Sequence, residues 1–239
     1  MSIVALTFDL DDTLWPVKPT LIRAEKATRN WLKSHAPSII DQFTLEDMLQ
    51  VRMVLLEEQP DLAHQVSELR RRAMEKMALE AGYSGNSASE LAESAFDVFL
   101  SHRQQVDCFP GVIELLANLS ENYVIGAISN GNADVFKTDL ASYFNFSVSA
   151  ETIGISKPDA AIFAHALEQV NAVSQQQCSA SEIIHIGDDY RSDIAGGKDF
   201  GNRTIWLASG NRENHDNGKA DAMIKDILEL PAALAALRR

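Results

Sequence analysis

The chain has 239 residues, and 46% of them are hydrophobic, which is enough for a sizeable core in one or two domains. Its 34 acidic and 21 basic side chains give a net charge of −13, which argues against nucleic acid or an anionic membrane as the main partner. No apolar stretch is long enough to span a bilayer, and the N-terminus lacks the basic segment of a signal peptide. Cys108 and Cys178 fit no metal or redox spacing, so we expect a cytoplasmic protein.

The first predicted element is a strand that ends in a cluster of acids. The apolar run over residues 3–8 indicates a buried parallel strand, and Asp9, Asp11 and Asp12 follow it. In open α/β sheets, ligands bind beyond the carboxyl ends of the strands. Carboxylates this close together repel one another unless a cation or shared protons relieve them. A hard divalent ion such as Mg²⁺ provides that relief and leaves room for a phosphate.

Residues 16–106 carry helical patterns and no convincing strand. Apolar residues lie on one helical face between Leu21 and Leu32, and the spacing recurs between residues 62 and 81. Two capping-box patterns, Thr44-x-x-Asp47 and Ser87-x-x-Glu90, predict the starts of two further helices. Four amphipathic helices joined by short breaks predict a small helical bundle.

From residue 109 the pattern alternates between strands and helices. Strands are predicted near 123–129, 146–150, 183–188, 203–208 and 222–225, and helices near 112–121, 133–142, 157–171 and 192–200, with a last helix from about 226. This alternation predicts a doubly wound parallel sheet of the α/β class. The simplest organisation is one α/β domain of residues 1–15 and 107–239, with the helical bundle of residues 16–106 inserted. The polar stretch 209–219 is predicted to be a surface loop.

Ser129 and Asn130 close the strand near 123–129. With the backbone N–H groups that follow, they offer a cradle for an anion. The alternative is a simple strand-to-helix turn with Asn132 as the helix N-cap.

Lys157 stands just before a predicted helix. Ser156-x-x-Asp159 fits a capping box with Pro158 in the first turn, which places Lys157 at a helix N-terminus. The helix dipole disfavours a cation there, so either the lysine has an anion beside it, such as a bound phosphate or Asp9, or it points into solvent.

The strand near 183–188 also ends in acids. Gly187, Asp188 and Asp189 follow its apolar residues, and Asp193 comes next at the start of a helix. Asp193 is placed either to cap that helix or to serve the acidic cluster. His185 lies within the strand and is interpreted as a core histidine.

These residues, in this order, resemble the four motifs of the haloacid dehalogenase (HAD) superfamily: Asp9 to Leu14, Ser129-Asn130, Lys157-Pro158, and Gly187-Asp188 with Asp193. Phe109-Pro110-Gly111 resembles the hinge by which such chains return from a small helical (C1) cap to the core. The resemblance implies a Rossmann-like core, Mg²⁺ dependence and hydrolysis of phosphate monoesters. Within the superfamily the sequence is similar to bacterial phosphatases that act on flavin mononucleotide (FMN) and on the phosphoribitylamino-uracil of riboflavin synthesis.

The resemblance also implies roles for individual residues. Asp9 is expected to be the nucleophile and Asp11 the general acid and base. The side chains of Asp9 and Asp188 and the backbone carbonyl of Asp11 are expected to hold Mg²⁺. Phosphate is expected at Ser129, Asn130 and Lys157, with Asp193, Asp189 and Thr13 supporting these groups from behind.

Three other activities remain open from the residues. A 2-haloacid dehalogenase uses the same nucleophile but needs neither Asp11 nor a metal. A phosphomutase keeps every motif, and a non-catalytic binding protein would be expected to have lost some of them.

Two residues near the first motif have no assigned role. Asp12 stands where many relatives have glycine, and Trp15 either stacks on a planar leaving group or packs at the hinge. The expected partner is a small phosphorylated metabolite, bound by a monomer or a homodimer.

Overall fold

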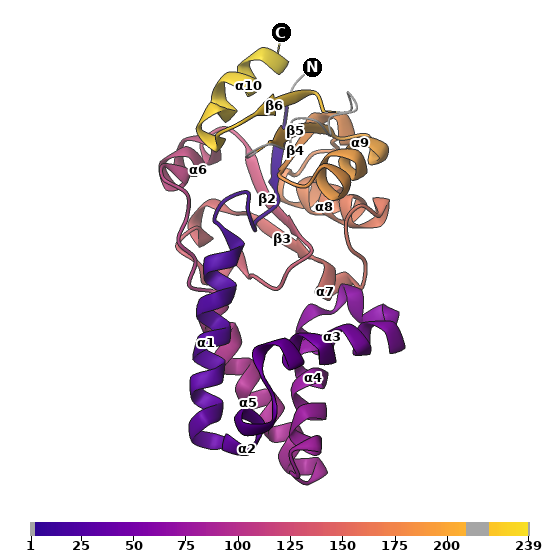
Figure 1. Cartoon of the computed structure of the whole chain (residues 1–239). Coiled ribbons are helices and arrows are strands. Elements are labelled where there is room, and N and C mark those ends of the chain that lie inside the picture. The colour runs from indigo at the N-terminus through magenta and orange to yellow at the C-terminus, as the bar shows by residue number, and fades with distance from the viewer. Residues whose placement is uncertain (1–2, 209–219, 239) are drawn as a thin grey trace. The chain divides into compact units, whose positions relative to one another are not determined.

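The computed structural model describes residues 3–208 and 220–238, so the predicted surface loop at 209–219 lies outside the described residues (Figure 1). The chain divides into two compact units. The first consists of Met1–Pro16 and Asp107–Arg239, and the second of Val17–Val106.

The first unit contains a parallel sheet. In the described part of the chain its strand order is β3-β2-β1-β4-β5-β6. The strands are β1 (Ala5–Phe8), β2 (Val124–Ser129), β3 (Phe146–Ser149), β4 (Ile183–Gly187), β5 (Arg203–Leu207) and β6 (Ala222–Ile224). Every neighbouring pair is parallel, so the predicted α/β class is confirmed.

The strand that carries the acidic cluster lies in the middle of the sheet. β1 pairs with β2 on one side and with β4 on the other, and all its residues are buried. This position explains its apolar sequence, because a central parallel strand is covered on both faces. It also brings the carboxyl ends of β1, β2 and β4 to one edge of the sheet.

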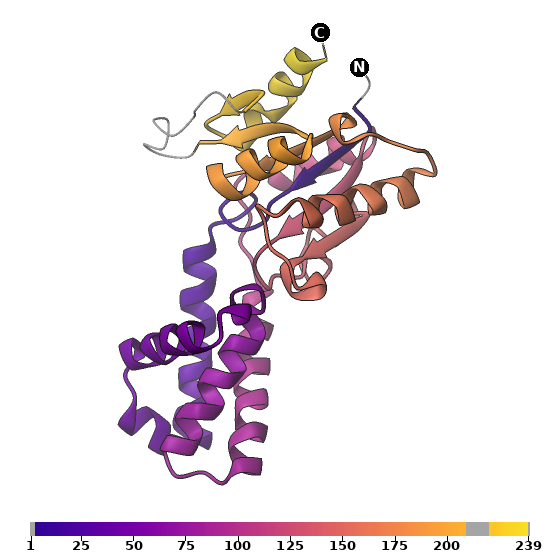
Figure 2. The same ribbon diagram turned by 90° about the vertical axis from the view of Figure 1, so that its right-hand side faces the viewer.

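Helices cover both faces of the sheet (Figures 1 and 2). α8 and α9 lie on one face and α6 on the other (Figure 1). The apolar side chains of α8, including Phe163 and Val170, pack on those of β1, β3 and β4. The helical elements of this unit are α6 (Val112–Ser120), η2 (Val135–Lys137), η3 (Ala141–Tyr143), α7 (Ala150–Ile153), α8 (Ala160–Ser174), η4 (Ala180–Glu182), η5 (Tyr190–Ala195), α9 (Gly196–Phe200), η7 (Ile227–Glu229) and α10 (Leu230–Leu237).

Two local predictions for this unit are wrong. The single helix expected over 133–142 is instead the two short turns η2 and η3. Thr138 separates them, because its hydroxyl donates to the carbonyl of Val135 and accepts from the N–H of Leu140. The helix start expected at Ser156 is also wrong. α8 begins later, capped by the carboxylate of Asp159, which accepts from the N–H of Ala161.

The second unit is helical. It contains α1 (Val17–His35), α2 (Pro37–Gln42), α3 (Leu45–Glu58), η1 (Pro60–His64), α4 (Val66–Glu80) and α5 (Gly85–Arg103). The capping box of Thr44 and Asp47 is confirmed at the start of α3. The box predicted from Ser87 is wrong, because α5 begins at Gly85 with Ser84 as its N-cap. Within the described residues, no helix has the length and apolarity needed to cross a membrane.

Candidate active site

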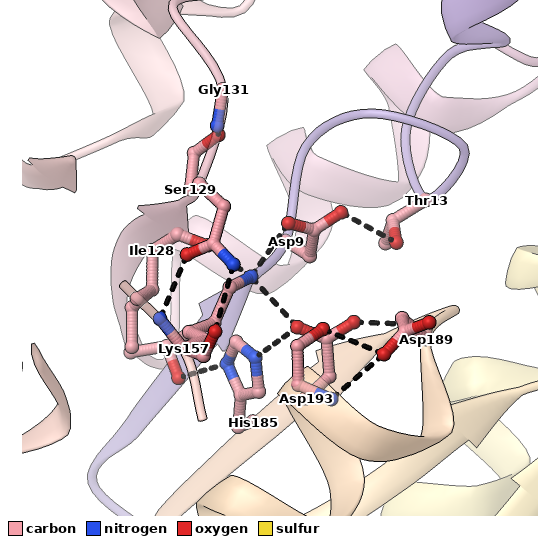
Figure 3. A network of polar contacts seen from close by, with 12 residues as sticks. Asp9, Thr13, Ile128, Ser129, Gly131, Lys157, His185, Asp189 and Asp193 are labelled. Carbon is pink, nitrogen blue, oxygen red and sulfur yellow. Dashed lines mark hydrogen bonds and ion pairs between the residues drawn. The ribbon is translucent and has the colours of Figure 1, made fainter. Parts of the chain in front are cut away.

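Predicted site residues from distant parts of the sequence meet at the carboxyl edge of the sheet (Figure 3). Asp9 follows β1, Ser129 ends β2 and Asp188 follows β4. Lys157, from the loop before α8, reaches the same place, because its ammonium contacts Asp9. All four side chains belong to buried residues. This is the edge at which ligands bind in open α/β sheets.

Lys157 is the cation at the centre of this cluster. Its Nζ lies 2.6 Å from Oδ1 of Asp9, 2.7 Å from Oδ1 of Asp193 and 2.6 Å from the carbonyl oxygen of Ile128. An ammonium has three N–H donors, so these three oxygens match its full capacity. The side chain is 1% exposed, which rules out the solvent-facing alternative.

The pKa values of Asp9, Asp193 and Lys157 depend on one another, because one ammonium contacts two buried carboxylates. Burial opposes ionisation of Asp193, but Lys157 and then His185 lower its pKa to about 2. Burial raises the pKa of Asp9 to about 8, against the opposing effect of Lys157 and with the help of the negative charge on Asp193. Burial by itself lowers the pKa of Lys157, but Asp193 and Asp9 together raise it well above its usual range. Asp9 is therefore short of positive charge.

Asp193 is held by protein donors on both of its oxygens. Its Oδ1 is 3.2 Å from Nε2 of His185, and its Oδ2 accepts from the N–H of Asp189 at 3.0 Å. A side chain at position 187 has no room, because a Cβ on Gly187 would lie 2.3 Å from the Asp193 carboxyl group. The cap of the following helix η5 is Asp189, not Asp193, since Asp189 accepts from the N–H of Ser192.

His185 is fully buried in β4 and takes part in this network. Because a carboxylate only accepts, Nε2 of the ring donates to Asp193, and Nδ1 lies 3.0 Å from the hydroxyl of Thr7. Burial lowers the pKa of His185, which keeps the ring neutral at neutral pH. The core interpretation of this residue from the sequence missed its bond to Asp193, because nothing in a strand sequence shows which residue lies opposite.

The carboxylates of Asp9, Asp188 and Asp193 form a group suited to a metal ion. One oxygen from each lies within 4.8 Å of the others, and all three residues are buried. Oxygen donors of this kind suit a hard divalent cation. Such a cation would supply the positive charge that Asp9 lacks, so the donor set fits Mg²⁺.

Asn130 has a contact that its spacing in the sequence does not reveal. Its side-chain oxygen accepts from the N–H of Lys157 at 2.8 Å, and its amide nitrogen donates to the carbonyl of the same residue at 3.0 Å. The amide thus holds the backbone of Lys157 with two bonds. The neighbouring Ser129 hydroxyl accepts from the N–H of Gly131 at 3.0 Å.

Asp11 and Thr13 lie on the loop after β1. The hydroxyl of Thr13 donates to Oδ2 of Asp9 at 3.3 Å. Oδ1 of Asp11 accepts from the indole nitrogen of Trp15 at 2.8 Å, and the Trp15 residue is fully buried. Burial of the whole indole agrees with packing at this loop and not with stacking on a leaving group.

Residues 3–201 match the family of haloacid dehalogenase-like hydrolases. The match covers most of the chain, so the protein belongs to this family, as its motifs predicted.

The curated relatives indicate which kind of hydrolase the chain is. The chain is 33% identical over 205 residues to the 5-amino-6-(5-phospho-D-ribitylamino)uracil phosphatase YigB of Escherichia coli (strain K12), covering 86% of this chain and 83% of that protein. Other curated relatives are also phosphatases or nucleotidases. The chain is therefore a phosphatase of the HAD type.

Solved structures agree with the fold. One described as a 2-haloacid dehalogenase from Pseudomonas syringae pv. Tomato DC3000 has a TM-score of 0.90 and 40% identity, and the match covers 98% of this chain and 99% of that one. The HAD-hydrolase YfnB from Bacillus subtilis, described as bound to magnesium, has a TM-score of 0.63 at 20% identity and covers 98% of this chain and 100% of that one. The second likeness shows the fold alone.

Proposed function

We propose that the protein is a Mg²⁺-dependent phosphatase that hydrolyses a small phosphate monoester through an aspartyl-phosphate on Asp9. The observation that carries this proposal is the cluster at the carboxyl edge of the sheet. It combines a buried nucleophilic carboxylate, the Lys157 ammonium 2.6 Å from it and the neighbouring carboxylate of Asp188. Cation and carboxylates together suit a phosphoryl group and a divalent ion in one place.

In the first step Asp9 attacks phosphorus in line, and the bond to the leaving oxygen breaks. The Lys157 ammonium neutralises both the carboxylate and the phosphate, while the Ser129 hydroxyl and the backbone N–H of Asn130 bind phosphoryl oxygens. The side chains of Asp9 and Asp188 and the backbone carbonyl of Asp11 would hold Mg²⁺, and the bound ion would supply positive charge between the two anions.

Proton transfer falls to Asp11. It gives a proton to the leaving alkoxide and then takes one from the water that hydrolyses the aspartyl-phosphate. Asp193, Asp189 and Thr13 act through their neighbours. Asp193 holds Lys157, Asp189 holds Asp193 through its backbone N–H, and Thr13 donates to Asp9.

Dehalogenation is the second candidate, favoured by the description of the 40% identical structure. In that reaction the same aspartate attacks carbon, and neither a proton donor nor a metal is needed. This chain has a carboxylate at position 11 and acids at positions 188 and 193, which support attack on phosphorus. A phosphomutase would use the same residues and is separated from a phosphatase by its product.

Relatives suggest which substrates to examine first. Because one relative is named a phosphatase of a riboflavin-pathway phosphate, we propose that compound and FMN as substrates. We also propose that residues 16–106 form the C1-type cap, which selects the leaving group and closes over it. A monomer or a homodimer fits this function.

The test is a panel of monoesters that contains FMN, nucleotides and sugar phosphates, assayed for free phosphate with and without EDTA. A 2-haloacid is included and assayed for free halide. We expect phosphate release that EDTA abolishes and that Mg²⁺ restores. Halide release without phosphate release would establish the dehalogenase instead, and isomerised sugar phosphate without free phosphate would establish a mutase.

A further inference from the structure

The loop that carries Asp11 is closed by Trp15. A parallel bridge joins Asp11 to Trp15, and the N–H of Asp12 donates to the carbonyl of Trp15 at 2.7 Å. The loop turns this tightly because Asp12 takes the left-handed conformation, with φ of 59°. Aspartate is one of the few residues besides glycine that visits this region readily. The indole of Trp15 is thereby directed back toward the Asp11 side chain.

The hydrogen bond between the two side chains has a fixed direction. The indole Nε1–H is 2.8 Å from Oδ1 of Asp11, and an indole nitrogen only donates. The bond therefore holds Oδ1 as an acceptor whether Asp11 is ionised or protonated. When Asp11 carries its proton, the proton belongs on the other oxygen, Oδ2.

The anchor itself is rigid. Trp15 is fully buried, and the neighbouring carbonyl of Leu14 accepts from the N–H of Phe109 at 2.9 Å. The N–H of Leu14 donates to the carbonyl of Leu10 at 2.9 Å. A donor fixed on a buried ring loses little entropy when it binds a carboxylate.

We propose that Trp15 is a positioning residue for proton transfer: its indole N–H holds Asp11 so that Oδ2 faces the leaving oxygen and, afterwards, the attacking water. This role rests on the proposed function, in which Asp11 is the general acid and base. In the first step the Oδ2–H bond breaks and the proton moves to the leaving alkoxide as its bond to phosphorus breaks. In the second step, Oδ2 takes a proton from the water that attacks phosphorus, and the bond between phosphorus and the Asp9 oxygen breaks.

The role has a signature that a purely structural residue lacks. An alkoxide is a poor leaving group and depends on protonation, whereas p-nitrophenolate leaves without it. Loss of the indole N–H is therefore expected to slow the first phosphoryl transfer from an alkyl phosphate and to spare the transfer from p-nitrophenyl phosphate. General damage to the site slows both to the same extent.

The experiment compares Trp15→Phe with the unaltered protein, both as the full chain with Mg²⁺. Rapid-quench kinetics measure the first transfer from p-nitrophenyl phosphate and from an alkyl monoester of the panel. We expect the rate with the alkyl ester to fall about 10-fold or more, with the roughly 10²–10⁴-fold effect of a lost general acid as the upper limit. We expect the rate with p-nitrophenyl phosphate to fall less than about 3-fold.

Two further variants make the result specific. Trp31→Phe is the matched control, since Trp31 stacks on His35 in the helical unit, and it is expected to change neither rate. Asp11→Asn gives the full size of the difference between the two esters. If Trp15→Phe fails to fold, a tryptophan analogue with sulfur in place of the ring N–H keeps the shape and removes only the donor.

The outcomes separate the inference from the function on which it rests. Equal losses on both esters, or no loss, in a variant at position 15 overturn the inference when Asp11→Asn still distinguishes the esters. If Asp11→Asn does not distinguish them, the assignment of Asp11 as the acid fails and the role of Trp15 falls with it.

Discussion

Each unit of the molecule contains a carboxylate paired with basic side chains, but the ratio of carboxylates to cations differs between the two units. In the helical unit Oε1 of Glu25 lies 3.1 Å from Nη1 of Arg52 and 2.5 Å from Nη1 of Arg70. The Arg70 guanidinium also lies 3.9 Å from the centre of the Phe99 ring. Burial opposes ionisation of Glu25, but Arg70 and Arg52 together lower its pKa.

In the α/β unit the balance is reversed. Asp9 and Asp193 share the single ammonium of Lys157, and burial raises the pKa of Asp9 to about 8. Two arginines balance the charge of Glu25, whereas one ammonium serves both Asp9 and Asp193. From this comparison we infer that a buried cluster with more carboxylates than cations is a better candidate for a metal site than a carboxylate that two arginines neutralise.

The largest expected effect comes from Asp9→Asn. The variant removes the nucleophile together with a carboxylate whose burial opposes ionisation, so we expect phosphatase activity to disappear while the thermal midpoint in EDTA is kept or raised. An assay of phosphate release checks the loss of activity, and a thermal melt in EDTA checks the stability. Near-full turnover would remove Asp9 from the mechanism, and a large loss of stability would show that its charge is well compensated. Glu25→Gln is the matched variant and is expected to keep activity.

Removal of the shared cation sharpens the same comparison. Lys157→Met leaves two buried carboxylates without their partner, for which we expect a loss of about 3–5 kcal/mol in the free energy of unfolding. Arg70→Met leaves Arg52 beside Glu25, so its loss is expected to be smaller. Urea unfolding of the two variants provides the measurement. An equal or larger loss for Arg70→Met would contradict the account of the two clusters.

Magnesium is expected to stabilise the folded protein through the Asp9 and Asp188 carboxylates and not through the Glu25 cluster. Binding to the folded state raises stability by about 2.7 kcal/mol at a free concentration 100 times the Kd. Thermal melts with EDTA and with Mg²⁺ should therefore differ for the unaltered protein and for Glu25→Gln. The difference should be strongly reduced in Asp188→Asn. A shift of the same size in Asp188→Asn would place the metal elsewhere.

The Glu25 cluster has its own dependence on pH. Because the pKa of Glu25 is lower in the folded protein than its ordinary value of 4.5, the stability it contributes is present above that value and is lost as pH falls through the folded pKa. Urea unfolding of Glu25→Gln should consequently show a shallower loss of stability than the unaltered protein below about pH 4.5. Identical acid limbs would show that the two arginines do not act on this carboxylate.

The smallest effect is expected at Asp12. Its φ of 59° suits glycine, whose greater freedom in the unfolded chain offsets the relief of strain. Asp12→Gly should change stability by less than about 1 kcal/mol, whereas the β-branched Asp12→Val should cost about 1–2 kcal/mol. Urea unfolding of both variants checks the pair, and equal losses would show that backbone conformation is not what matters at this position.

The sequence alone predicts the parallel sheet and the edge of the sheet at which the acidic residues lie. A buried parallel strand and the residue after it can be recognised locally, so Asp9, Ser129 and Asp188 were predicted from their places at strand ends. Their grouping followed from the rule that carboxyl ends of parallel strands share an edge.

Contacts between residues far apart could not be predicted in this way. The two bonds from Asn130 to Lys157 join positions 27 residues apart, and the bond between Thr7 and His185 spans 178. Local breaks were also missed, because one hydroxyl, that of Thr138, ends a helical turn that its neighbours would otherwise continue. Glu25, Arg52 and Arg70 come from three helices, and no spacing unites them.

The most direct test of the central claim is to look for the phosphoryl group on Asp9 itself. The protein is mixed with a monoester substrate and Mg²⁺, quenched in acid within one turnover and digested. The masses of the peptides are then measured by mass spectrometry. We expect the mass of one phosphoryl group on the peptide that carries Asp9. With p-nitrophenyl phosphate, whose leaving group needs no acid, we expect a larger phosphorylated fraction in Asp11→Asn, where the base for hydrolysis is lost. Continued turnover with that peptide unmodified, or with the group on another residue, would contradict the account.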